Sequence, residues 1–85
     1  MVEVKSSDMP NELRALVEAL ATDTTQGETD WLVIGQKLRD QVNEQQPGNW
    51  QCIVSEHDFA SLIRYEPGSY IKLSTNLHYI ILFKC

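Results

Sequence analysis

The hydrophobic positions of this chain change their period close to residue 50. Before that point, apolar residues mostly recur every three or four positions, and after it they alternate or run together. The first spacing is typical of amphipathic helices, and the second is typical of strands. The pattern therefore predicts helices in the first part of the chain and a sheet built mainly from the second part.

Two helices are expected before residue 50. The first starts near Pro10, because proline is favoured at the first helical position, and it ends between Thr22 and Gly27. Asp30 or Thr29 caps the second helix, and the turn residues that begin at Pro47 end it. The two apolar stripes are Leu13, Leu16, Val17, Leu20 and Ala21 in the first helix, and Trp31, Ile34, Leu38 and Val42 in the second.

Strands are expected where apolar and polar residues alternate between turn signals. The turn at Glu66-Pro67-Gly68-Ser69 has the chemistry of type II, with proline at its second position and glycine at its third. The predicted strands are a short edge strand from Val2 to Ser7, followed by Trp50 to Ser55, Phe59 to Tyr65, Tyr70 to Thr75 and His78 to Lys84.

The last strand is apolar at every position from Tyr79 to Phe83, so both of its faces are expected to be buried. Such a strand needs a covering layer on each side, and two short helices cover only one. The sequence therefore predicts that a second copy of the chain supplies the other layer.

Composition narrows the class of protein. With 85 residues the chain forms one domain, 1–85, and its net charge of −5 argues against a nucleic-acid partner. No apolar run approaches the roughly 20 residues that span a bilayer, and no signal-peptide pattern begins the chain, so a cytoplasmic location is expected. Cys52 and Cys85 form no disulfide framework; we expect Cys52 to be buried and Cys85 to be free.

Candidate chemistry is sparse. His57 and His78 stand in no nucleophile motif, and no metal-ligand spacing or glycine-rich phosphate loop is present. The sequence therefore predicts a non-catalytic protein without cofactor or metal. One alternative is an enzyme or ligand carrier with an open pocket lined by Trp31, His57 and Tyr65. The other is a binding module that uses a strand edge, for which the 59–65 segment is the natural candidate.

Four segments carry a family resemblance: Asp8-Met9, Asn49-Trp50-Gln51-Cys52-Ile53-Val54, Phe59-Ala60-Ser61 and Ile80-Ile81-Leu82-Phe83-Lys84. Together with the order of elements, they make nearly the whole chain resemble the small dynein light chains of the hub type. The resemblance implies an α+β fold, with two helices packed on an antiparallel sheet in a strand-swapped homodimer that forms a β-sandwich. In that dimer the 59–65 strand joins the sheet of the partner.

The resemblance also implies a function. Family members bind extended, disordered segments, often centred on Thr-Gln-Thr, by strand addition in grooves at the dimer interface. Dynein intermediate chain is one such partner, and a cytoskeleton-associated location follows. The implied groove residues are Trp31, Leu32, Phe59, Ala60, Ser61, Leu62, Ile63, Arg64, Tyr65, Tyr70, Lys72 and Ser74, and the implied dimer-interface residues are Gln51, Ile53, Leu62 and Ile63.

Several positions depart from the family pattern. Trp31-Leu32 stands where the family has the Glu-Lys pair that holds a target glutamine, and Gln51 replaces an interface histidine whose protonation separates the family's dimer. Ala60 replaces a glycine, and Lys72 and Ser74 replace two tyrosines of the groove. An unpaired glutamine amide in the groove costs roughly 1–3 kcal/mol, so these changes argue against Thr-Gln-Thr recognition.

A second form of the resemblance leads to an alternative function. The chain is also similar to the C-terminal half of flatworm tegument calcium-binding proteins, in which an EF-hand module precedes a dynein-light-chain-like domain. In that case the chain is an excised dimerisation domain with a degenerate groove, and calcium binds to the absent half.

Overall fold

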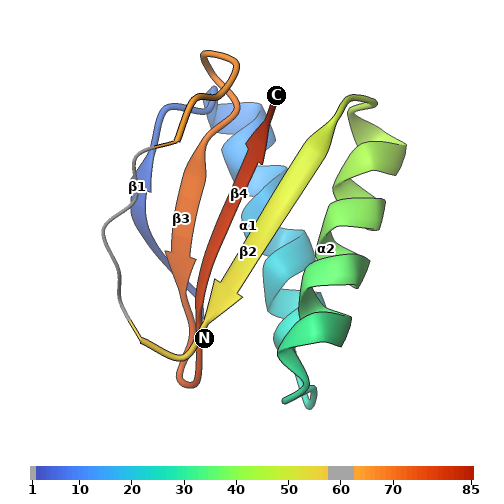
Figure 1. The fold of residues 1–85 in the computed structure, drawn as a ribbon, viewed down its shortest axis with the longest axis vertical. Helices are drawn as coiled ribbons and strands as arrows, with labels where there is room; N and C mark the ends of the chain where they lie inside the picture. Colours follow the sequence, from blue (N-terminus) through green and yellow to red (C-terminus); the bar gives the residue numbers. More distant parts are fainter. Residues whose placement is uncertain (1, 58–62) are drawn as a thin grey trace.

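The computed structural model describes residues 2–57 and 63–85. In this part of the chain, strand β1 (Glu3–Ser7) is followed by helices α1 (Asn11–Thr25) and α2 (Trp31–Gln45) and then by strands β2 (Trp50–Ser55), β3 (Ile71–Ser74) and β4 (Tyr79–Lys84). Figure 1 shows both helices on the same face of the sheet, with α2 lying along β2.

The sheet has the order β1-β3-β4-β2, and each neighbouring pair is antiparallel. Strand β4 therefore lies between β3 and β2, whereas β1 and β2 form the two edges. The pairing of β2 with β4 is regular over its whole length, from Trp50 opposite Lys84 to Ser55 opposite Tyr79. The turn between β3 and β4 is closed by Thr75, whose amide donates to the carbonyl of His78 at 2.8 Å.

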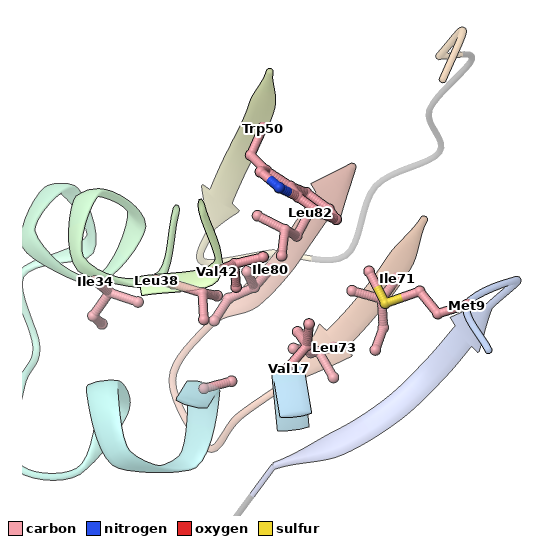
Figure 2. Packing of buried hydrophobic residues seen from close by; sticks show 11 residues of the cluster. Met9, Val17, Ile34, Leu38, Val42, Trp50, Ile71, Leu73, Ile80 and Leu82 are labelled. Atoms are coloured by element: carbon pink, nitrogen blue, oxygen red, sulfur yellow. The ribbon is translucent and has the colours of Figure 1, made fainter. Parts of the chain in front are cut away.

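The core lies between the helices and the inner face of the sheet. Each helix presents one apolar stripe, and each strand contributes every second side chain, so the two periods meet in one buried layer. Figure 2 shows how these side chains converge, with Ile34 at the left of the view, Met9 at the right and Trp50 above them. The buried cluster comprises Met9, Val17, Ala21, Ile34, Leu38, Val42, Trp50, Ile71, Leu73, Ile80 and Leu82.

Polar residues fix where the second helix begins. The carboxylate of Asp30 accepts a hydrogen bond from the amide of Leu32 at 3.0 Å, which satisfies one of the free donors of the first turn of α2. This confirms the expected cap. Because Asp30 sets the start of the helix, it also places Trp31 and Leu32 in the first turn, beside the edge strand.

The structure confirms most of the predicted elements. Two helices pack on a four-stranded antiparallel sheet, and β2 has the predicted bounds. The expected strand from Phe59 to Tyr65 lies partly outside the described residues. Its described end, from Ile63 to Tyr65, belongs to no strand, because a strand requires a neighbouring strand and this end has none.

The prediction that a single chain leaves the outer face of its last strand uncovered is wrong. Ile81 is 0% exposed and Phe83 is 6% exposed in the single chain. Strand β4 is a central strand, with β3 on one side and β2 on the other. The exposed apolar side chain of this face belongs instead to the edge strand, since Ile53 of β2 is 39% exposed. The incomplete part of the sheet is therefore its β2 edge.

Candidate functional site

Strand β2 offers main-chain groups for pairing with another strand. The carbonyl of Asn49 accepts a hydrogen bond from the amide of Cys85 at 3.0 Å. In an antiparallel ladder, hydrogen-bonded pairs alternate along the strand, so Gln51, Ile53 and Ser55 are the residues bonded to β4. The N–H and C=O groups of Cys52 and Val54 consequently point away from β4, and no other described part of the chain pairs with them.

The opposite edge of the sheet differs. The register of β1 against β3 shifts between Val4 and Ser6, and β1 carries the charged side chains of Glu3 and Lys5. A register irregularity and charges are features that discourage pairing at a strand edge. Strand β2 has neither, so it is the edge better suited to take up another strand.

A cavity of about 420 Å³ lies beside this edge, between β2 and the part of α2 from Trp31 to Arg39. The space between helix and strand exists because α2 has a glycine at position 35. A Cβ atom there would occupy part of it, in contact with Val54 at 3.5 Å and with the Cys52 sulfur at 4.0 Å. The described residues that line it are Trp31, Leu32, Gly35, Gln36, Arg39, Cys52 and Val54. The cavity is thus mainly apolar and adjoins the unpaired main-chain groups of β2.

The floor of the cavity is electrically neutral. Burial raises the pKa of the Cys52 thiol to about 12, although the positive charge of Arg39 acts in the opposite direction. Cys52 is therefore an uncharged thiol at physiological pH, with the character of a small apolar side chain. Arg39 lies at the other end of the cavity, where its guanidinium is 3.4 Å from the carboxylate of Asp40.

Two apolar side chains border the cavity in the first turn of α2. Trp31 is 50% exposed and Leu32 is 72% exposed. The sequence predicted both residues for the groove, and they do line the cavity. Neither His57 nor Tyr65 is among its described lining residues, so the arrangement that the ligand-carrier alternative required is not the one found.

The remaining predicted groove residues lie elsewhere. The Tyr65 and Tyr70 rings stack with their centroids 4.9 Å apart, just before β3. Lys72 and Ser74 alternate with the buried Ile71 and Leu73, so they point to the outer face of the sheet, where the Lys72 ammonium is 6.0 Å from the centroid of the Tyr79 ring. A single chain therefore places Trp31 and Leu32 on the helix face of the sheet and Lys72 and Ser74 on the opposite face.

The predicted dimer-interface residues of β2 share one surface. Gln51 and Ile53 are exposed and lie on the outer face, away from α2. Ile63 is half-buried, and Leu62 lies outside the described residues, as do the groove residues Phe59, Ala60 and Ser61. The outer face of β2 is thus open where the resemblance implies contact with a second copy.

No catalytic arrangement emerges from the described residues. His57 lies in the loop after β2, where its amide donates to the Ser55 hydroxyl at 3.2 Å, and His78 is buried at the β3–β4 turn. The described residues contain no group of three potential metal ligands among His, Cys, Asp and Glu. In the same part of the chain, no helix has the length and hydrophobicity needed to cross a bilayer.

Solved structures with the same fold are available for comparison. The dynein light chain-like domain of the Fasciola hepatica calcium-binding protein FhCaBP2 superimposes with a TM-score of 0.84 at 16% identity, covering 99% of this chain and 91% of that one. The native structure of that domain superimposes with a TM-score of 0.75 at 18% identity, covering 100% of this chain and 91% of that one. The dynein light chain-like domain of CsTAL3 (residues 83–177) superimposes with a TM-score of 0.81 at 13% identity, covering 98% of this chain and 90% of that one.

Sequence comparison agrees with the structural one. No curated protein matches the chain. The family model described as dynein light chain type 1, however, matches residues 1–85, which is the whole sequence. The chain therefore belongs to the dynein light chain type 1 family.

Proposed function

We propose that this protein is a non-catalytic homodimeric interaction module that binds extended protein segments by strand addition. The observation that carries the proposal is the β2 edge, where Cys52 and Val54 offer main-chain groups that no other described strand pairs with, beside an apolar cavity. Membership of a family that is generally non-catalytic and mediates protein interactions agrees with it.

In the proposed dimer, the segment from Phe59 to Tyr65 of each copy crosses over and pairs with β2 of the other. Cys52 and Val54 supply the main-chain partners, and the outer face at Gln51 and Ile53 contacts the second sheet. The absence of a strand between Ile63 and Tyr65 is consistent with this proposal, because a crossing strand acquires its partner only in the dimer.

Target segments would then add beside the crossed-over strand. Two copies are needed for such a groove, because one chain presents Trp31 and Leu32 on the helix face but Lys72 and Ser74 on the outer face. We propose these residues, together with Tyr70 and the 59–65 segment, as the walls of two equivalent grooves. In this role the protein would be cytoplasmic and associated with the cytoskeleton. Dynein intermediate chain would be among its partners.

Sedimentation equilibrium tests the dimer. The wild type is expected to be a dimer at micromolar concentration, and Ile53→Lys is expected to shift it to monomer by placing a charge on the outer face of β2. Val54→Pro is a second variant, because it removes an outward-pointing N–H while leaving the pairs with β4 intact. Leu77→Lys, at a side chain that is 57% exposed in the β3–β4 turn, is the matched control and should stay dimeric. A monomeric wild type would contradict the proposal.

One observation favours a second candidate. The similar solved domains belong to FhCaBP2, a calcium-binding protein, and to CsTAL3, in which the domain spans residues 83–177. The alternative function is accordingly a dimerisation domain of a longer calcium-binding protein, with a groove that binds no peptide. Titration with labelled extended peptides separates the two functions, since a dimer that binds none of them would favour the alternative.

A further inference from the structure

The only charge that lines the cavity beside β2, among the described residues, is positive. Among the described residues that line it, Arg39 is the single charged side chain, and no carboxylate faces it there. The bond between Arg39 and Asp40 joins two largely exposed side chains, 45% and 68% accessible, so it holds the guanidinium weakly. Arg39 is therefore available to an incoming anion.

The other end of the cavity is apolar. Trp31 and Leu32 expose large side chains to solvent, and the neutral Cys52 and Val54 form the floor behind them. A glutamine side chain placed here would find no charged group among the residues that line this end of the cavity, Trp31, Leu32, Cys52 and Val54. A bulky aliphatic or aromatic side chain would instead bury apolar surface at roughly 25 cal/mol per Å².

The distance between Leu32 and Arg39 on α2 is similar to the distance between side chains on one face of an added strand. Leu32 and Arg39 are seven positions apart on α2, which is about 10 Å along the axis at 1.5 Å per residue. Residues two positions apart in a strand face the same side about 6.6 Å apart, and residues four positions apart are about 13 Å apart. In either case the distance along the strand differs from the distance along the helix by about 3 Å, which a flexible arginine side chain can span. At an odd spacing, the second side chain of the bound segment points to the other face of the strand, away from α2.

We propose that the segments bound in this groove carry a bulky apolar residue with an acidic residue two or four positions away. The apolar side chain packs against Trp31 and Leu32, and the carboxylate pairs with Arg39. This inference rests on the proposed function and specifies its partner class: an extended segment with one or two acids, since the net charge of −5 repels a strongly acidic one.

Fluorescence titration with short labelled peptides tests the proposal. Each peptide has one leucine in a serine and threonine background, with glutamate placed one, two, three or four positions after it. Further peptides replace the glutamate by glutamine, replace the leucine by alanine, or contain Thr-Gln-Thr. The emission of Trp31 provides a label-free readout, because Trp50, the other tryptophan, is only 3% exposed.

Two charge variants separate the pairing from general electrostatics. Arg39→Gln should abolish the preference for glutamate over glutamine, while Lys37→Gln, which removes the same charge from an exposed position of α2 outside the cavity, should retain it. For the wild type, the expected preference is about twofold to fivefold at even spacings and absent at odd ones. The preference should also decrease as salt is added.

The outcomes are distinguishable when the oligomeric state is measured on the same samples. Tighter binding of Thr-Gln-Thr than of leucine–glutamate peptides, or an unchanged preference in Arg39→Gln, would overturn this inference and leave the proposed function standing. A dimer that binds none of the peptides would overturn both the inference and the peptide-binding part of the proposed function.

Discussion

Asp8 and Tyr70 are joined by two reciprocal hydrogen bonds although they are far apart in sequence. The amide of Asp8 donates to the carbonyl of Tyr70 at 3.1 Å, and the amide of Tyr70 donates to the carboxylate of Asp8 at 2.9 Å. The same carboxylate accepts from the amide of Gly68 at 3.1 Å. The chain leaving β1 is thereby fixed to the turn that precedes β3, and with it the position of Tyr70 against Tyr65.

Replacing Asp8 by alanine should destabilise the fold. Two backbone N–H groups lose a charged acceptor, which costs about 1–2 kcal/mol at this partly solvated site. Chemical denaturation should show the corresponding drop in the unfolding free energy. Asp8→Asn keeps one acceptor oxygen, so its unfolding free energy is expected to lie between those of the wild type and Asp8→Ala. An alanine variant as stable as the wild type would show that solvent replaces these bonds without loss.

Two glycines should respond to alanine with opposite signs. Gly35 lies inside α2, and an added Cβ meets its neighbours at 3.5 Å or more, so Gly35→Ala should stabilise by about 0.5–1 kcal/mol through helix propensity. Gly27 has φ +75° with open space around it, so Gly27→Ala should destabilise by about 1–2 kcal/mol. Thermal unfolding of the two variants measures both changes in stability. Midpoint shifts of the same sign would contradict the opposite effects expected for Gly35 and Gly27.

Cys52 should make stability depend on alkaline pH. Because burial raises the pKa of Cys52 to about 12 in the folded chain, the unfolded chain loses this proton at lower pH. Stability is then unaffected below roughly pH 8.5 and falls as the pH rises towards 12. Urea unfolding of the wild type and Cys52→Ala from pH 7 to about 11 should show a smaller decline in the variant. Parallel declines would exclude Cys52 as the cause.

At acid pH, the proposed dimer should persist. Gln51 stands on the outer face of β2 and has no proton to gain, so no charge develops there between about pH 7 and pH 5. Sedimentation velocity across this range should show a constant mass. Gln51→His is the informative variant, since it should introduce acid dissociation. A wild type that converts to monomer near pH 6 would contradict the expected role of this position.

The sequence predicted most of the fold because its periods are clear. The segment from Trp50 to Ser55 was predicted as a strand and forms β2 with the same bounds, and the stripe of Ile34, Leu38 and Val42 forms the buried face of α2. The burial of Ile81 and Phe83 within one chain was not foreseen. Hydrophobicity shows that a strand needs cover, but only the strand order shows that β4 lies between two neighbours.

The candidate site was predicted less completely. Trp31 and Leu32 were identified through the family resemblance, whereas Gly35 and Arg39 were missed. A glycine beside the apolar stripe of a helix was the available signal, because the missing side chain leaves room against the facing strand. The cavity itself depends on how α2 lies along β2, and this distance is not encoded in either segment alone.

Amide hydrogen exchange at Cys52 and Val54 tests the central claim most directly, because these are the N–H groups that the free edge of β2 offers to a second copy. The proposal predicts that both amides become protected as protein concentration and mass rise together, approaching the protection of Ile53, whose amide bonds β4. Fast exchange at Cys52 and Val54 at high concentration, with Ile53 protected, would contradict pairing at this edge.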